Sequence, residues 1–261
     1  MIFVELQKFN EALKNYINIQ TSPLAVKMVS GESELPEKVK MPSKHFKNRL
    51  TICQAFNMAR YNGLSIALGR EDQSCPVGSV ILGFQKPVSY FTEGKMVAGM
   101  YAVSEEIGAL MEKDLQCFPH GKYSHLLVAP LNRAAYEPDF VNIYCNPAQL
   151  MRLVHGARYN NGQIINSSFT GRAECSHAIV PTIEYGKYQV VLPSNGERVF
   201  AHTQDFEMSF AVPLAKAGDL VAGLEESHKN GIRYPIPFFV NYKASFPPSL
   251  TKIEEAWNEV E

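Results

Sequence analysis

A short apolar run that ends at a proline and gives way to a helical pattern occurs twice in this chain. The run at 140–145, Phe-Val-Asn-Ile-Tyr-Cys, is followed by Asn146 and Pro147, and a helical apolar stripe continues to 157. The run at 206–212 ends at Pro213, and a second stripe continues to 224. Asparagine is a favoured N-cap, and proline is favoured at the first helical position. Both segments are therefore predicted to be a strand followed by a helix.

The other apolar patterns predict further helices and strands. Helices are expected at 5–19, 43–63, 95–116 and 173–184, and strands at 23–29, 64–68, 126–131 and 188–192. Together these elements favour an α+β fold class, with a mixed sheet and flanking helices. We expect residues 1–261 to form a single domain.

Two stretches of the chain resemble each other in their order of features. Cys53 leads through a predicted helix and strand to a loop that holds Cys75, and Cys175 leads in the same way to a loop that holds Ser194. A repeated order of this kind predicts two related halves, 20–125 and 126–231, with 232–261 as a C-terminal strap over the body. Chance similarity between two strand–helix units is the alternative.

Composition and charge restrict the partners. The chain is 46% hydrophobic and 20% charged, and its net charge of −1 gives no electrostatic reason for nucleic acid binding. No apolar run approaches the ~20 residues of a membrane span, and the N-terminus lacks the pattern of a signal peptide. We therefore expect a cytoplasmic protein with no nucleic-acid or membrane partner. The aromatic residues of the tail favour a homodimer.

The five cysteines are odd in number and widely scattered, which argues against a disulfide framework. Cys53 lies on the apolar stripe of a predicted helix, whereas Cys75 lies in a polar turn, where burial gains little. Cys175 begins a predicted helix, whose positive end favours the thiolate. Cys117 and Cys145 are predicted to pack. The first three are candidate metal ligands, and a buried structural thiol is the alternative for Cys53.

A second group of candidate residues, near Cys175 in the predicted site, could bind an anion. Arg172 and Arg198 could bind a carboxylate or phosphate bidentately, with surface arginines beside glycine turns as the alternative. The turn at Ser194 and Gly196 could also form a backbone nest for an anion. These four residues are the candidate binding site for a small anionic ligand.

The chain is similar to a known family in several short segments. They are Pro23-Leu24-Ala25-Val26-Lys27, Cys53-Gln54-Ala55, Ser74-Cys75-Pro76-Val77-Gly78, Ala129-Pro130-Leu131, Glu137-Pro138-Asp139, Gln149, Gly171 with Cys175, Gly196-Glu197-Arg198 and Glu207. Over about residues 20–225 the chain resembles the domain-of-unknown-function-169 family of uncharacterised prokaryotic proteins. Family members often carry a further cysteine in a Cys-x-Gly-x-Arg loop, where this chain has Ser194.

The resemblance implies a cofactor. Three matching cysteines and a fourth would suit an iron–sulfur cluster. With Ser194 at the fourth place, it implies either a site with a foreign fourth ligand or one that has lost its metal. Three function classes follow. The first is a protein that binds a metal or iron–sulfur-type cofactor, with a redox-linked role. The second is a thiol or general acid–base enzyme on a small anionic substrate, and the third is a non-enzymatic ligand-binding protein whose cysteines only pack.

Overall fold

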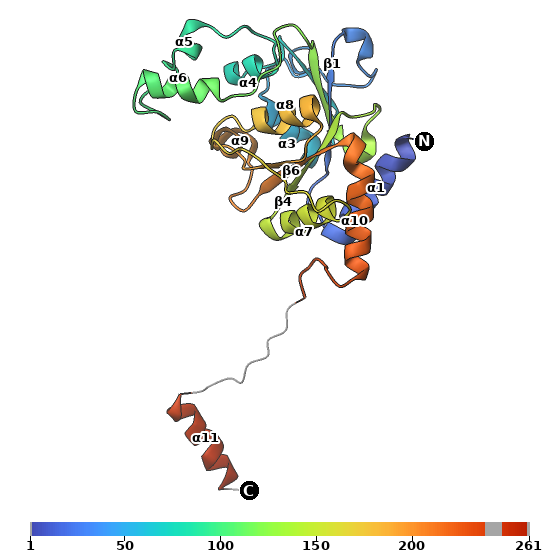
Figure 1. The fold of residues 1–261 in the computed structure, drawn as a ribbon, viewed down its shortest axis with the longest axis vertical. Coiled ribbons are helices and arrows are strands. Elements are labelled where there is room, and N and C mark those ends of the chain that lie inside the picture. Colours follow the sequence, from blue (N-terminus) through green and yellow to red (C-terminus); the bar gives the residue numbers. More distant parts are fainter. Residues whose placement is uncertain (1, 238–246, 260–261) are drawn as a thin grey trace.

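The structure, a computed structural model, describes residues 2–237 and 247–259 and contains one six-stranded sheet (Figure 1). Its strands are β1 (Leu24–Val29), β2 (Ile66–Gly69), β3 (His125–Pro130), β4 (Phe140–Cys145), β5 (Gln189–Val191) and β6 (Met208–Pro213). They lie in the order β2-β3-β1-β4-β6-β5. The α+β class is confirmed. The sheet differs from the predicted mixed sheet because every ladder between these strands is antiparallel.

Helices cover both faces of the sheet (Figure 1). One core lies under α1 (Ile2–Ile17), α7 (Pro147–Arg158) and α10 (Ala217–Lys229), and the other lies under α3 (Ile52–Asn62), α4 (Pro76–Ile81) and α8 (Cys175–Tyr185). Alternate residues of a strand point to opposite faces. Val141 and Ile143 of β4 accordingly enter the first core, and Phe140 and Tyr144 enter the second.

The remaining helices lie outside these two layers or at their rim. They are α2 (Pro42–His45), α5 (Ser89–Thr92), α6 (Glu105–Lys113), α9 (Asn195–Ala201), α11 (Pro248–Asn258) and the 3₁₀ turns Glu32–Glu34, Leu131–Arg133 and Leu214–Lys216. Helix α11 lies apart from the sheet and its helices in Figure 1. The predicted strap includes 238–246, which lies outside the described residues.

Cap residues fix the helix boundaries. Asn146 is the N-cap of α7, and its side chain accepts a hydrogen bond from the backbone N–H of Gln149, as the Asn-Pro pattern predicted. The helix predicted over 43–63 is instead two helices, because Thr51 begins a new one at α3. Of the helix predicted over 95–116, α6 is the regular part, and its N-cap is Ser104.

The two sides of the sheet have equivalent strand orders: from edge to centre, each side runs through the second, third and first strand of its own set of three. On one side it runs β2, β3, β1, and on the other it runs β5, β6, β4. The two sides meet where β1 pairs with β4, with Leu24 opposite Asn142. This order groups β3 with β1 and β2, whereas the predicted boundary at 126 lies within β3. Relatedness of the two halves stays a prediction.

Candidate functional site: a thiol-lined pocket

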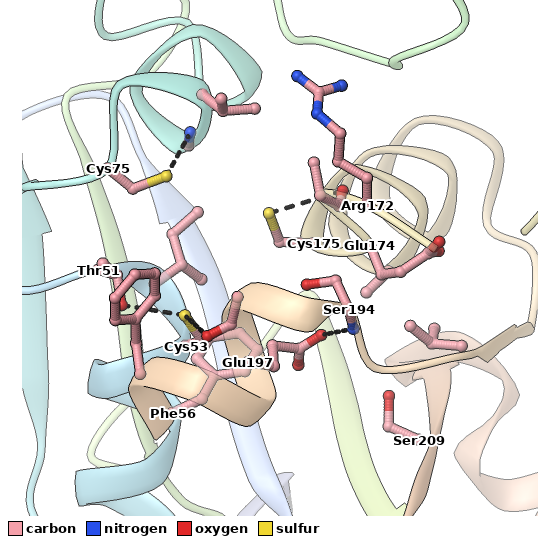
Figure 2. Close-up of a pocket in the computed structure, with 18 of the residues that line it drawn as sticks. Thr51, Cys53, Phe56, Cys75, Arg172, Glu174, Cys175, Ser194, Glu197 and Ser209 are labelled. Carbon is pink, nitrogen blue, oxygen red and sulfur yellow. Dashed lines mark hydrogen bonds between the residues drawn. The ribbon is translucent and has the colours of Figure 1, made fainter. Parts of the chain in front are cut away.

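A cavity of about 240 Å³ lies between the sheet and the helices of its second face (Figure 2). Three of the five cysteines line it, and so does the start of α9. Its lining consists of Thr51, Ile52, Cys53, Phe56, Cys75, Val77, Gly78, Met96, Val97, Met100, Tyr101, Asn142, Tyr144, Arg172, Ala173, Glu174, Cys175, Ala178, Val191, Ser194, Gly196, Glu197, Phe200 and Ser209. Most of these side chains are apolar.

The first thiol is held by the start of α3. Thr51 is the N-cap, and its hydroxyl oxygen accepts a hydrogen bond of 3.1 Å from the backbone N–H of Gln54. The same oxygen lies 3.0 Å from Sγ of Cys53, in the first turn of the helix. Across the cavity, this sulfur lies 4.0 Å from the carbonyl oxygen of Gly196. The cap therefore fixes both the helix and the direction of the thiol.

The second thiol is itself a cap. Cys75 is the N-cap of α4, and its Sγ accepts a hydrogen bond of 3.3 Å from the backbone N–H of Gly78. Pro76 occupies the first turn, where its missing N–H costs nothing. The polar turn that contains Cys75 in the sequence is thus the start of α4.

The third thiol follows a turn with an unusual backbone. Ala173 has a φ of 54°, in the left-handed region that residues with a Cβ seldom occupy. The carboxylate of Glu174 holds this turn by accepting hydrogen bonds of 2.8 Å from the N–H of Thr170 and 2.7 Å from that of Gly171. Cys175 then begins α8, with its sulfur toward the cavity (Figure 2).

Helix α9 adds a carboxyl group that the sequence analysis missed. Ser194 is its N-cap, so the predicted turn at Ser194 and Gly196 is in fact a helix start. The carboxyl of Glu197 accepts hydrogen bonds of 2.9 Å from the Ser194 N–H and 2.9 Å from the Tyr144 hydroxyl. Burial raises the pKa of Glu197, and these two donors oppose the shift. Serine followed three residues later by glutamate is a capping-box spacing, which could have revealed both features.

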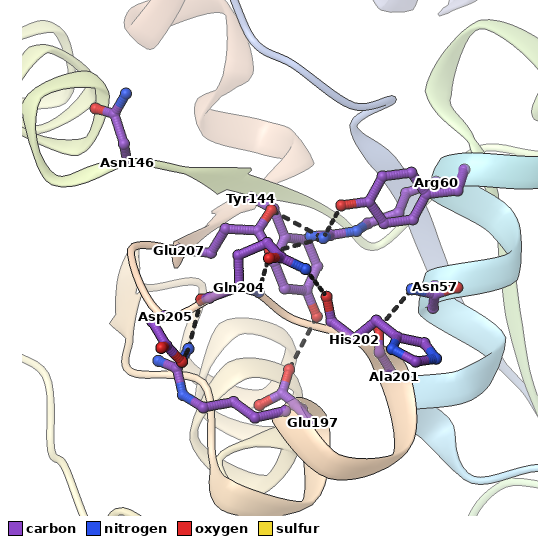
Figure 3. Close-up of polar contacts among 12 residues, drawn as sticks. Asn57, Arg60, Tyr144, Asn146, Glu197, Ala201, His202, Gln204, Asp205 and Glu207 are labelled. Carbon is purple, nitrogen blue, oxygen red and sulfur yellow. Dashed lines mark hydrogen bonds and ion pairs between the residues drawn. The ribbon is translucent and has the colours of Figure 1, made fainter.

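A buried ion pair lies behind Tyr144 (Figure 3). One nitrogen of the Arg60 guanidinium donates to both carboxylate oxygens of Glu207, each at 2.8 Å. The guanidinium also lies 3.9 Å from the centroid of the Tyr144 ring. A continuous set of contacts therefore connects this pair, through Tyr144, to the carboxyl of Glu197 in the pocket.

Burial opposes ionisation of two of the pocket thiols, Cys53 and Cys175. Burial raises the pKa of Cys53 to about 11, against the opposing hydrogen bond from Thr51. Burial also raises the pKa of Cys175 well above its usual value, and Cys75, Cys53 and Glu197 add to the shift. Desolvation and the nearby acidic groups oppose the helix dipole at Cys175, so its thiolate stays a prediction.

The two arginines of the predicted anion site are engaged elsewhere. Arg172 lines the pocket, but its guanidinium donates to Glu112 at 2.7 Å. Arg198 does not line it, and binds the carbonyl oxygen of Gln204 and the carboxylate of Asp205. The pocket thus brings together Ser194 and Gly196 but not both arginines, and a small anionic ligand stays a prediction.

The other two cysteines lie away from the cavity. Cys145 is buried in the core on the opposite face of the sheet, as predicted for a packing residue. Cys117 is exposed, so its predicted packing role is wrong. In the described residues, no group of three or more His, Cys, Asp or Glu side chains could hold a metal ion.

These features define a class, an α+β protein with a thiol-lined pocket over the second face of an antiparallel sheet. Residues 12–223 match the model of the DUF169 family, whose description reads "Uncharacterised ArCR". The chain belongs to this family. An uncharacterised protein of Methanocaldococcus jannaschii is 22% identical over 223 residues, which are 85% of this chain and 94% of that protein. No solved structure matches the chain.

Among the described residues, no helix combines the length and the apolar character that crossing a membrane requires. The homodimer prediction depends on aromatic residues of which Phe238, Phe239, Tyr242 and Phe246 lie outside the described residues, and it stays a prediction.

Proposed function

We propose that this protein binds a sulfur-ligated metal cofactor of the iron–sulfur type between Cys53, Cys75 and Cys175. The observation that carries the proposal is that these thiols come from three separate helix starts and line one cavity. Cysteines that serve only as packing residues have no reason to line the same cavity. Cys145, for example, packs in the core on the other face of the sheet.

The order of elements supports the proposal. In the first half, α3 with Cys53 leads to β2 and then to the N-cap Cys75. In the second half, α8 with Cys175 leads to β5 and then to the N-cap Ser194. In this order Ser194 takes the place that corresponds to Cys75, and Figure 2 draws Cys53 and Cys75 on one side of the pocket and Cys175 and Ser194 on the other.

The electrostatics of the pocket favour a cationic metal group. Cys53 and Cys175 have raised pKa values and lie near the carboxyl of Glu197, so each would lose its proton only when a metal compensates the charge. The positive ends of α3 and α8 would then stabilise the thiolates. A cluster of this kind supplies electron transfer or a Lewis-acidic iron when bound.

Among the residues that the structure describes, no group of side chains is arranged to hold a single metal ion, so the proposal concerns a cluster and not one ion. A cluster places irons and sulfides between its ligands, so its cysteines stand farther apart than those around one ion. On this proposal the three thiols ligate the cluster, and its fourth position is left to Ser194 or to a group from outside the chain.

A second candidate is a small-ligand-binding protein whose thiols remain protonated. The mostly apolar lining of the pocket favours it. On this alternative the three cysteines would make apolar contacts to an organic molecule, and no metal would bind. The two candidates predict opposite results in one experiment.

The test is anaerobic reconstitution of the purified protein with ferrous iron and sulfide, followed by measurement of bound iron, bound sulfide and the visible absorption spectrum. We expect the wild-type chain to retain iron and sulfide in a fixed ratio. Cys75→Ser should lose both, because serine is a poor ligand for the cluster. Cys117→Ser is the matched control, since that thiol is exposed and outside the pocket lining, and it should retain both.

A gain-of-ligand variant sharpens the test. Ser194→Cys restores a fourth thiol at a helix start, in the position that Cys75 occupies on α4. We expect the reconstituted variant to lose its visible absorption more slowly than wild type on exposure to air. Equal and negligible iron in wild type, Cys75→Ser and Ser194→Cys would refute the cofactor and leave the second candidate.

A further inference from the structure

Asn142 places an amide in the middle of an apolar sheet face. On the same face of β4, the residues two positions before and after it, Phe140 and Tyr144, belong to the second core. The residues paired with it, Leu24 on β1 and Ala211 on β6, belong to the same core. Only 1% of the surface of Asn142 is exposed. A leucine has nearly the same shape and would fill this position without burying a polar group, so the amide calls for an explanation.

The side chain of Asn142 lacks the partner that a buried amide needs. Within the described part of the chain, its Oδ1 has no hydrogen-bond partner. Leaving a buried acceptor unpaired is costly, and native proteins rarely do so without a functional reason. Asn142 lines the pocket. The unpaired oxygen is covered in this structure, and it belongs to a residue of the cavity lining, so a rotation of the amide would present it to a molecule in the cavity.

A second polar residue of the sheet lines the pocket beside it. Ser209 on β6 is 2% exposed and lies opposite Tyr144 in the ladder, two residues along β4 from Asn142. Figure 2 places Ser209 well away from Cys75. We refer to Asn142 and Ser209 together as the sheet floor. The thiols come from the helices above, so the pocket has two chemically different ends.

We propose that the sheet floor binds a small organic ligand that donates a hydrogen bond from an N–H group to Oδ1 of Asn142. The same pocket presents apolar contacts from Ile52, Phe56 and Phe200. The ligand is therefore compact and largely apolar, and it carries an amide, amidine or similar N–H donor.

Charge and size limit the ligand further. The carboxyl of Glu197 lies in the pocket, while the guanidinium of Arg172 is paired with Glu112, so the ligand is neutral or cationic rather than anionic. A cavity of about 240 Å³ has the volume of about eight liquid water molecules, which suits a single aromatic ring with a small substituent. A cofactor held by the three thiols would take part of this same cavity, so the ligand is tested in the metal-free protein, where the whole volume is open.

The test uses two probes of nearly equal shape, benzamide and acetophenone. Both have an aromatic ring and a carbonyl group, but only benzamide has an N–H donor. Dissociation constants are measured by NMR titration of the metal-free full chain. We expect benzamide to bind about tenfold more tightly than acetophenone, since only benzamide satisfies the buried acceptor. Asn142→Leu should remove this preference while it retains binding of acetophenone.

Thermal unfolding separates the proposal from a purely structural role. If Asn142 serves a ligand, Asn142→Leu should raise the unfolding midpoint of the ligand-free protein, because the buried unpaired acceptor is gone. If a buried water satisfies the amide for structure alone, the same variant should lower the midpoint and wild type should show no probe preference. Asn142→Ala removes the acceptor with less bulk and gives the same probe comparison if leucine impairs folding. Equal binding of the two probes to wild type, no binding of either, or a preference that persists in both variants would each overturn the proposal.

Discussion

At the level of single residues, the pocket depends on polar groups that lie behind it. Arg60 and Glu207 are almost completely buried, with side-chain exposures of 1% and 9%, yet neither reaches the cavity lining. Arg60 packs on the ring of Tyr144, whose hydroxyl donates to Glu197. The buried pair thus holds the tyrosine that orients the pocket carboxyl. Neither residue was a site candidate from sequence, because their contact joins positions 147 residues apart.

Removal of one partner of this pair should be strongly destabilising. Glu207→Gln keeps the shape of the side chain but leaves the Arg60 guanidinium buried without a counter-charge, so we expect a loss of about 3–5 kcal/mol in the free energy of unfolding. Urea denaturation measures the loss. Glu93→Gln is the matched control, because Glu93 pairs with Lys95 on the surface, and its midpoint should match that of wild type. Equal midpoints for the two variants would contradict the role of the buried pair.

At the level of elements, helix starts build the site. The thiols of Cys53, Cys75 and Cys175 lie at the first turn or N-cap of α3, α4 and α8, and Ser194 caps α9. A helix start fixes the direction of its first side chains through local hydrogen bonds, so it places a ligand group with little dependence on the rest of the loop.

The cap of α3 offers a direct test. Thr51→Ala removes the oxygen that accepts from the Gln54 N–H and contacts Cys53, and we expect it to lower the free energy of unfolding by about 1 kcal/mol. Thr51→Ser retains the oxygen and should lie close to wild type. The comparison uses urea midpoints of the three proteins under identical conditions. If serine and alanine destabilise equally, the methyl group rather than the cap is responsible.

The sequence predicted local features better than long-range ones. Asn146-Pro147 predicted the start of α7. The candidate residues Cys53, Cys75, Cys175 and Ser194 all line one pocket, and their role as ligands stays a prediction. Apolar runs do not reveal strand direction, so the antiparallel sheet was not foreseen. The engagement of Arg172 by Glu112 depends on a contact 60 residues away, which no local pattern encodes.

At the level of the whole molecule, the sheet joins two sets of three strands through one central ladder. β1 and β4 pair antiparallel, and both are buried on both faces, with Val26 and Phe140 opposite each other. The pocket takes Cys53 and Cys75 from one set and Cys175 from the other. Neither set alone could cover its central strand or complete the lining. We therefore propose one folding unit made of two related halves.

Division of the chain tests this proposal. Glu137 is exposed and lies between β3 and β4, so fragments 1–137 and 138–261 separate the two sets of strands. Each fragment alone would expose an apolar strand as a new sheet edge, and we expect neither to unfold cooperatively. Co-expressed fragments should associate and recover a cooperative thermal transition, monitored by circular dichroism, because the β1–β4 ladder can form between them. The intact chain at the same concentration is the control. A fragment that unfolds cooperatively by itself would instead establish two independent domains, and the pocket would then be an interface between them.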